Sequence, residues 1–214
     1  MTIFHFIRHG QTQWNVAKRM QGRSDSPLTK EGYFQATRVS QLYEHKNISA
    51  VYSSPSKRAL KTADTICNQH TLKPVIINEL MEMNFGDWEG MHFNDIRKKY
   101  PEQYFDFWYQ PDKYRPVNGK GELFCQVKTR AVFTIRSLVK IHPNEEIIVV
   151  THGALLIILM SFFTQKKLSE VWNPFAINNG SRTIVEINNN SSRIHLYGDV
   201  THLKTESTNV VGHW

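Results

Sequence analysis

The regular alternation of strand-like apolar runs with helix-like segments constrains the fold of this chain more than any other feature. The strand-like runs cover residues 2–8, 49–53, 74–77 and 147–150, and the helix-like segments cover 30–45, 56–69, 122–141 and 154–163. The run from Ile147 to Val150 is continuously β-branched, which is typical of a parallel strand buried on both faces. The alternation therefore predicts a mainly parallel sheet covered by helices.

The composition is that of an ordinary globular protein. The chain has 214 residues, of which 40% are hydrophobic and 21% charged, so we expect one α/β domain or at most two small ones. There is no run of 18 apolar residues, and the N-terminus resembles a strand rather than a signal peptide. Cys67 and Cys125 fall near the apolar faces of helix-like segments. We expect buried free thiols in a reducing cytoplasm.

The net charge of +7 is spread along the chain, with Lys-Lys pairs at 98–99 and 166–167 and no longer block. A nucleic-acid binder would concentrate its Lys and Arg in a run or a stripe. We therefore expect neither a nucleic-acid partner nor a membrane partner. The charge is interpreted as a solvated basic surface, and the alternative is a positive field that attracts anionic substrates.

Residues 84–118 differ from the rest of the chain because they combine ten aromatic side chains with three prolines. Two interpretations remain open, a helical subdomain that forms one wall of a pocket and a lid over a site. We favour the wall. Further along, residues 182–187 and 193–197 resemble a hairpin around Asn188-Asn189-Asn190, and the tail from Gly198 carries no pattern.

Two predicted strands end in the same way, in His9-Gly10 and in His152-Gly153. Ligands of open α/β sheets bind outside the carboxyl ends of the strands, so both imidazoles are expected at a ligand site. Each glycine lets the backbone approach a ligand, and each leads toward a helix N-terminus that favours anions. The matched pairs indicate an anion site.

A phosphate site also needs fixed positive charge and a proton donor. Arg8 adjoins His9 and converges on the site only if the strand breaks there, and Arg58 lies in the turn from the second strand into a helix. For the acid, Glu82 follows a strand and is flanked by apolar residues. Three neighbouring carboxylates stay open as alternatives, namely Glu79, Asp87 and Glu89.

Several segments of the chain, in the same order along the sequence, resemble the histidine phosphatase superfamily, also called the phosphoglycerate mutase-like family. They are Arg8-His9-Gly10-Gln11-Thr12-Gln13-Trp14-Asn15, residues 21–32, residues 53–63, residues 82–90, Gly121-Glu122 and Thr151-His152-Gly153. The resemblance implies a three-layer α/β/α sandwich with a mostly parallel sheet, formed by residues 1–214 as a single domain.

The resemblance also implies a role for each matched residue. His9 would become phosphohistidine, and Glu82 would protonate the leaving alkoxide and then accept a proton from water. The groups implied around the phosphoryl oxygens are Arg8, Arg58 and His152, and the further phosphate-binding residues are Asn15, Gln21, Gly22, Thr12 and Gly153. The second ring nitrogen of His9 is expected to bind a backbone carbonyl, so that the ring attacks as neutral imidazole.

These residues need no metal and no cofactor, because the fixed cations stabilise the transferred phosphoryl group. A zinc site is disfavoured, since His5 and His9 lie four apart on a strand and the remaining histidines are scattered. We therefore expect a metal-independent phosphatase acting on a small anionic phosphomonoester.

Two alternatives remain, a phosphoglycerate mutase (an isomerase) and a non-catalytic regulatory module. Glu82 and His152 are only 70 residues apart, a spacing that resembles the short phosphatases of the family rather than the longer mutases. All five proposed catalytic residues are present, which argues against the regulatory module.

Sugar phosphates, a nucleotide-loop phosphate such as α-ribazole phosphate, and phosphoglycerates all stay open as substrates. The aromatic side chains of residues 84–118 either contact a ring or apolar leaving group or pack on one another, and we favour packing. The sequence predicts no oligomeric state.

Overall fold

The computed structural model describes residues 1–68, 70–172, 177–188 and 191–204. This part of the chain forms a six-stranded sheet from β1 (Thr2–Arg8), β2 (Ala50–Ser53), β3 (Val75–Ile76), β4 (Glu146–Thr151), β5 (Arg182–Ile187) and β6 (Ser192–Asp199). The strand order is β3-β2-β4-β1-β5-β6. The first four strands pair in parallel, whereas β5 is antiparallel to both of its neighbours. The prediction of a mostly parallel sheet is confirmed.

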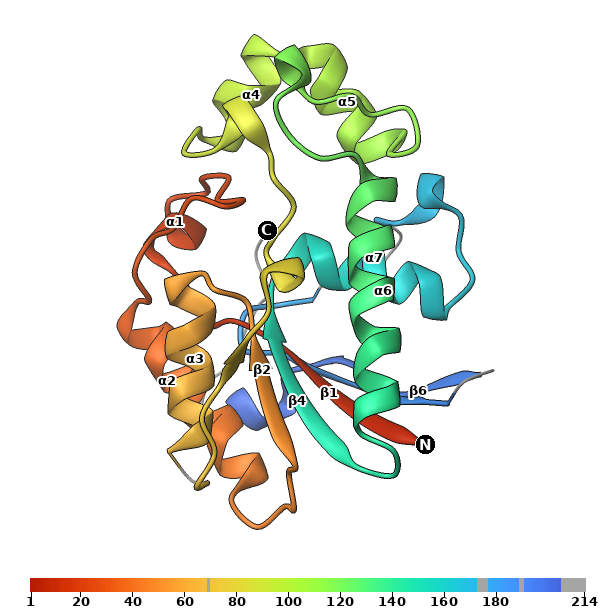
Figure 1. Ribbon diagram of the computed structural model, residues 1–214. Helices are drawn as coiled ribbons and strands as arrows, with labels where there is room; N and C mark the ends of the chain where they lie inside the picture. The colour runs from red at the N-terminus through yellow and green to blue at the C-terminus, as the bar shows by residue number, and fades with distance from the viewer. Residues whose placement is uncertain (69, 173–176, 189–190, 205–214) are drawn as a thin grey trace.

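Helices cover both faces of the sheet, as Figure 1 shows. The described α-helices are α1 (Gln13–Val16), α2 (Lys30–Tyr43), α3 (Lys57–Cys67), α4 (Phe93–Lys99), α5 (Pro101–Tyr109), α6 (Phe124–Ile141) and α7 (Gly153–Phe163). One buried cluster joins the sheet to α2 and α3, and a second joins it to α6 and α7. The predicted three-layer α/β/α arrangement is therefore confirmed.

The β-branched run of β4 explains how one strand serves two cores. Ile147 and Val149 belong to the cluster under α6 and α7, whereas Ile148 and Val150 belong to the cluster under α2 and α3. Successive side chains of a strand point to opposite faces, so a continuous apolar run is needed where both faces are covered.

α2 begins where the sequence predicts the helix, at residue 30, but one residue of its apolar spacing is exposed. Thr29 caps the helix, accepting a hydrogen bond from the Gly32 amide at 3.0 Å. The helical spacing of Tyr33, Ala36 and Val39 predicts that all three point inward, but Tyr33 is 48% exposed, whereas Ala36 and Val39 are fully buried. In the first turn Gly32 takes the inward position, since a Cβ there would lie 2.1 Å from the carbonyl oxygen of Gln11.

Residues 84–118 contain α4 and α5, which Figure 1 shows above the sheet and apart from it. Phe107 lies at the centre of their aromatic packing. Its ring centroid is 5.5 Å from that of Trp88 and 5.2 Å from those of both Tyr114 and Phe124. All four side chains are buried, so this region has an aromatic core of its own that is continuous with the cluster under α6 and α7.

The C-terminal hairpin forms as expected from β5 and β6, although Asn189 and Asn190 lie outside the described residues. The prediction for the cysteines was half wrong. Cys67 is buried and Cys125 is exposed, because Cys125 follows the buried Phe124 and one residue turns a helix by about 100°. Among the described helices, none is long and apolar enough to span a membrane.

Candidate active site

The central pair of parallel strands brings both His-Gly pairs to one edge of the sheet. Arg8 is in register with Thr151 across β1 and β4, and the His9 amide donates to the Thr151 carbonyl at 3.0 Å. The ring centroids of His9 and His152 are consequently 5.2 Å apart. The prediction that the two imidazoles meet at the carboxyl ends of the strands is confirmed.

The ring of His9 is held in one orientation. Nδ1 lies 2.8 Å from the carbonyl oxygen of Gly10, the backbone contact expected from the sequence, and His9 is 2% exposed. The Arg58 Nε–H group points at His9 Nε2 over 3.3 Å. Burial, and then the charges of Arg58 and Arg8, hold the pKa of His9 well below its usual range. The ring is therefore neutral, with its proton on Nδ1 and its lone pair on Nε2, where it accepts the long contact from Arg58.

Arg58 lies in the first turn of α3 and is 1% exposed. Its guanidinium donates to the carbonyls of Gly22 and Ser24 at 2.7 and 2.8 Å, and to the Asp25 carboxylate at 3.0 Å. The Gly22 to Asp25 segment thus wraps around the guanidinium and fixes its plane beside His9. With the contact from Nε to His9, four of its five N–H donors are engaged, and one Nη2 hydrogen remains for a phosphoryl oxygen.

Arg8 is the last residue of β1 and lines the same pocket as His9. The strand therefore ends where it must for the two neighbouring side chains to converge. One of its Nη atoms donates to the Ile177 carbonyl, while its buried Nε has no protein partner among the described residues. Burial lowers the pKa of Arg8 to about 10, which leaves it charged at neutral pH. Gly153 permits this placement, because a Cβ there would lie 3.1 Å from the Arg8 guanidinium carbon.

His152 contacts the edge of the His9 ring, is fully buried and is not one of the residues that line the pocket. Its Nε2 is 2.7 Å from the Ser54 hydroxyl, and its Nδ1 has no partner within the described part of the chain. Burial, and then the charges of Arg58, His9 and Arg8, keep the pKa of His152 well below its usual range. This ring is therefore also neutral.

Of the four candidate carboxylates, only Glu82 lines the pocket described here. Its Oε1 accepts from the amides of Met83 and Leu155, both at 2.9 Å, and its Oε2 accepts from the Ala154 amide at 3.0 Å. The carboxylate thus caps the first turn of α7. Each oxygen has two lone pairs, so Oε2 keeps one for a proton.

The three alternative carboxylates have other partners. Glu89 accepts from the amides of Arg23, Ser24 and Phe85 and from the Ser24 hydroxyl. Asp87 accepts from the side chain of Asn118. The carbonyl of Glu79 accepts from the side chain of Arg130, so it is the main chain of this residue that supports the site.

The predicted phosphate-binding residues divide into two groups. Asn15, Gln21, Gly22 and Gly153 line the pocket. Thr12 instead lies beneath Asn15, because its amide and hydroxyl donate to Asn15 Oδ1 at 3.0 and 2.9 Å. With Oδ1 occupied, the side-chain NH₂ group of Asn15 is the donor that remains for a ligand.

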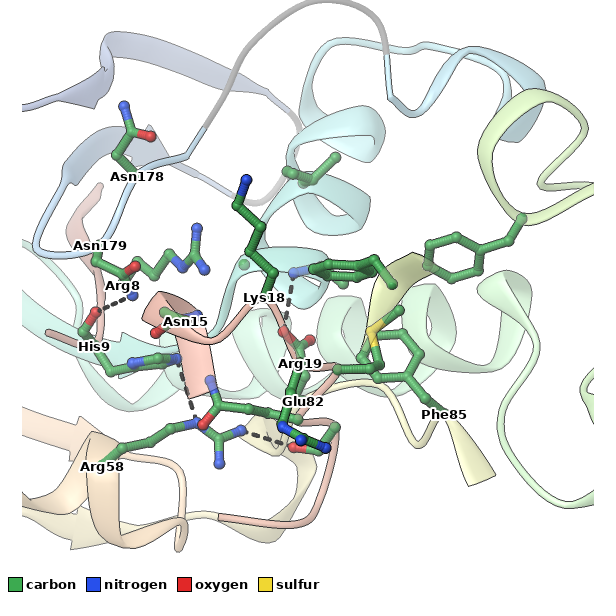
Figure 2. Close-up of a pocket in the computed structure, with 18 of the residues that line it drawn as sticks. Arg8, His9, Asn15, Lys18, Arg19, Arg58, Glu82, Phe85, Asn178 and Asn179 are labelled. Atoms are coloured by element: carbon green, nitrogen blue, oxygen red, sulfur yellow. Dashed lines mark hydrogen bonds between the residues drawn. The ribbon is translucent and has the colours of Figure 1, made fainter. Parts of the chain in front are cut away.

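Figure 2 shows further pocket residues that the sequence did not reveal. Lys18, Arg19 and Asn178 line the pocket, and Asn179 does so while its side chain donates to the His9 carbonyl at 3.1 Å. Asn178 and Asn179 lie between α7 and β5 in a stretch without periodicity. Only the turn-forming Asn-Asn-Gly of residues 178–180 marked it as a loop.

No group of three or more His, Cys, Asp or Glu residues in the described ranges is arranged to hold a metal ion. The pocket has a volume of about 500 Å³. Its cations, neutral imidazoles and single carboxylate form a set that can bind a phosphoryl group and exchange a proton.

Comparison with known proteins gives the class to which this fold and site belong. The sequence profile of the histidine phosphatase superfamily (branch 1) matches residues 4–200, and the chain belongs to that family. The expectation of a phosphatase-type enzyme with a phosphoglycerate mutase-like fold is confirmed at this level.

Individual relatives and solved structures indicate which kind of enzyme of this family the chain resembles. A metal-independent phosphoserine phosphatase of Arabidopsis thaliana is 32% identical over 96% of this chain and 84% of its own length. The structure of Bacillus stearothermophilus YhfR, with 37% identity, covers 95% of this chain and 100% of that one at a TM-score of 0.91. Phosphoserine phosphatase of Entamoeba histolytica, solved in complex with 3-phosphoglyceric acid, has 27% identity, the same coverages and a TM-score of 0.84. The two relatives named by activity are phosphatases, which favours the phosphatase over the mutase.

Proposed function

We propose that this chain hydrolyses a small phosphomonoester in two steps, through a phosphohistidine at His9. The observation that carries the proposal is the state of the His9 ring, which is neutral, with Nδ1 bound to the Gly10 carbonyl and Nε2 beside the Arg58 guanidinium. A buried neutral imidazole fixed beside a cation is a nucleophile directed at an anion.

In the first step, the Nε2 lone pair forms a bond to phosphorus while the bond from phosphorus to the ester oxygen breaks. Glu82 gives its Oε2 proton to the departing alkoxide, which leaves as the alcohol. Arg8, Arg58 and the Asn15 amide surround the phosphoryl oxygens. Fixed donors of this kind stabilise the charge that develops during phosphoryl transfer.

In the second step, water attacks the phosphorus atom of the phosphohistidine. Glu82 accepts a proton from the water, the bond from nitrogen to phosphorus breaks, and phosphate leaves. Glu82 is then protonated and the His9 lone pair is free, so the site is ready for the next cycle. His152 lies against the His9 ring and would add its unpartnered Nδ1 to the groups around the phosphoryl oxygens.

The proposal extends to the whole chain. Residues 1–214 would act as a single domain in the cytoplasm, with residues 84–118 as a wall of the pocket, on a free small anionic substrate. It needs neither a metal nor a cofactor, and it involves no nucleic-acid or membrane partner. The role of residues 84–118 as a wall of the pocket is supported by four of their aromatic residues, because Phe85, Phe93, Phe107 and Trp108 all line the pocket.

Trapping of the phosphoenzyme tests the proposal. Wild-type protein mixed with a ³²P-labelled phosphomonoester without added metal and quenched in base should carry an acid-labile label, which His9→Ala abolishes together with turnover. His45→Ala, at an exposed position of the chain, should behave as wild type. Full turnover by His9→Ala would refute the mechanism. Transfer of the label to 3-phosphoglycerate in preference to water would instead identify a mutase.

A further inference from the structure

The pocket is apolar beyond its phosphate-binding end. The apolar residues that line this part are Phe85, Phe93, Phe107, Trp108, Ile157 and Trp172. Phe93, Trp108, Ile157 and Trp172 are half-buried and present surface to a ligand, and we call these four residues the apolar wall. The volume of about 500 Å³ lies within the range of about 300–1,000 Å³ that is usual for drug-sized ligands. A phosphate with a three-carbon leaving group would leave much of it unfilled.

Three residues of the apolar wall pack on one another without a ligand. The Trp172 indole N–H donates to the Phe107 carbonyl, and the Trp172 ring centroid is 4.9 Å from that of Trp108. Phe93 also packs on Trp108, with ring centroids 6.5 Å apart. Because these rings are already held by one another, little conformational entropy is lost when they bind a leaving group.

The charges around the apolar wall are unsuitable for an amino-acid leaving group. Serine would bring a carboxylate and an ammonium group into the pocket. Lys18 and Arg19 at the pocket could meet the carboxylate. The ammonium would have no carboxylate except Glu82, the only one among the described lining residues, which the proposed mechanism requires as acid and base. An unpaired ammonium beside aromatic rings is unfavourable because it loses water without gaining a partner.

We infer that this chain prefers phosphomonoesters of apolar, ring-bearing alcohols over those of amino acids or short polar alcohols. The inference rests on the proposed function, since it places the phosphoryl group at His9 and the leaving group on the apolar wall. Burial of a ring there is expected to raise kcat/KM by about 10- to 100-fold over an ester without it. Stacking and edge contacts with Trp108 and Trp172 would orient the ring.

Steady-state kinetics on three esters tests the inference. The substrates are 2-phenylethyl phosphate, ethyl phosphate and phosphoserine, whose ester oxygens are all those of primary alcohols, so intrinsic reactivity differs little. We expect kcat/KM to be at least roughly tenfold higher for 2-phenylethyl phosphate than for either of the others. If phosphoserine is hydrolysed as well or better, the inference is wrong and the phosphatase mechanism stands.

A variant locates the preference on the apolar wall. Ile157→Asn on α7 should lower the ratio of kcat/KM for 2-phenylethyl phosphate to that for ethyl phosphate by about tenfold. Ile141→Asn, at the exposed end of α6 where Ile141 is 62% exposed, should leave the ratio unchanged. An unchanged ratio in folded Ile157→Asn protein would contradict the assignment of the leaving group to the apolar wall.

Binding separates this inference from the chemistry. Calorimetric titration of the wild-type protein with 2-phenylethylphosphonate and ethylphosphonate measures affinity without turnover. In both compounds carbon is bonded directly to phosphorus, so there is no ester bond to hydrolyse. We expect about tenfold tighter binding of the phenyl compound. This preference would persist even if no ester were hydrolysed, in which case only the proposed function would fail. Equal affinities would overturn the inference.

Discussion

Arg130 and Glu122 form a two-pronged ion pair, with Nε and Nη2 of the guanidinium 2.8 and 3.0 Å from the two carboxylate oxygens. The same guanidinium donates to the carbonyls of Glu79, Met81 and Glu82. Burial acts to raise the pKa of Glu122, and the hydrogen bonds that it accepts, from Arg130 first, outweigh burial and lower it. Arg130 is therefore a positioning residue, which holds the main chain that carries Glu82.

Arg130→Ala should lower kcat by roughly 10- to 100-fold, because a small displacement of Glu82 misplaces the proton. KM should change much less, since Arg8 and Arg58 are untouched. The loss of these partly buried contacts should also decrease the free energy of unfolding by about 1–3 kcal/mol. Steady-state kinetics and urea unfolding measure both effects.

Two further variants control this prediction. Arg130→Lys keeps the charge without the planar fork and should restore activity only partly. Arg136→Ala, at an exposed position of the same helix, should resemble wild type. An equal loss for Arg130→Ala and Arg136→Ala would remove the positioning role.

Arg58→Gln should lower kcat/KM by about 10²- to 10³-fold, the usual effect of removing one preorganised donor from a developing anion. Lys61→Gln, one turn further along α3 and exposed, is the matched control and should have little effect. Initial-rate measurements on ethyl phosphate suffice, and a loss of less than tenfold for Arg58→Gln would show that this guanidinium does not bind the transferred group.

Gly153→Ala should reduce activity without loss of stability. The added Cβ would lie 3.1 Å from the guanidinium carbon of Arg8, so the guanidinium must shift by a few tenths of an ångström. Alanine is favoured over glycine in a helix by up to about 1 kcal/mol. We expect a rise in KM and unchanged or higher thermal stability, measured by kinetics and by calorimetry. A wild-type KM would show that Arg8 tolerates the methyl group.

The free energy of unfolding should fall as the pH decreases below about 6.5. Burial is the largest cause that lowers the pKa values of His5, His9, His152 and His202. The unfolded chain, with ordinary histidine pKa values near 6.5, binds more protons than the folded chain over the interval below that value. The contribution of these neutral histidines to the free energy of unfolding is therefore fully present above pH 6.5. It is lost as the pH falls toward their lowered pKa values in the folded chain.

Urea unfolding at pH 7.5, 6.0 and 5.0 measures this dependence. Each buried histidine can contribute up to about 1.4 kcal/mol per pH unit. His5→Gln, which can keep a hydrogen bond to Glu146, should reduce the slope, while His45→Gln at the surface should not. A constant free energy of unfolding across this range would contradict the neutral state assigned to the site histidines.

The two thiols should react at different rates. Cys125 is exposed, whereas Cys67 is buried and its pKa is raised to about 11, chiefly by burial. Titration of the native protein with a chromogenic disulfide should modify one thiol rapidly and the second only after denaturant is added. Two rapid reactions in native protein would mean that Cys67 is accessible.

The parts of the site that could be predicted were those fixed by strand ends. His9 and His152 follow β1 and β4, and parallel strands in register bring their ends together whatever the loops do. The orientation of Glu82 could not be read in this way. Its carboxylate caps α7, and that contact joins residues 72 and 73 positions apart.

The remaining pocket residues could not be predicted because loops and long-range contacts bring them to the pocket. Lys18 lies in the left-handed region with a φ of 51°, a conformation that nothing in its neighbouring residues indicates. Asn179 reaches the His9 carbonyl across 170 positions of the chain. Periodicity reports on faces of helices and strands, so it is silent about residues placed by loops.

Most groups of the site are held by main-chain atoms. The Gly10 carbonyl holds His9, the carbonyls of Gly22 and Ser24 hold Arg58, and the Ile177 carbonyl holds Arg8. A carbonyl is the same in every residue, so substitution of a supporting residue leaves its hydrogen bond in place as long as the backbone keeps its path. Sequence drift around such a site is therefore constrained by backbone shape rather than by side-chain identity, and this gives a lineage wide freedom to change its residues while the chemical groups keep their positions.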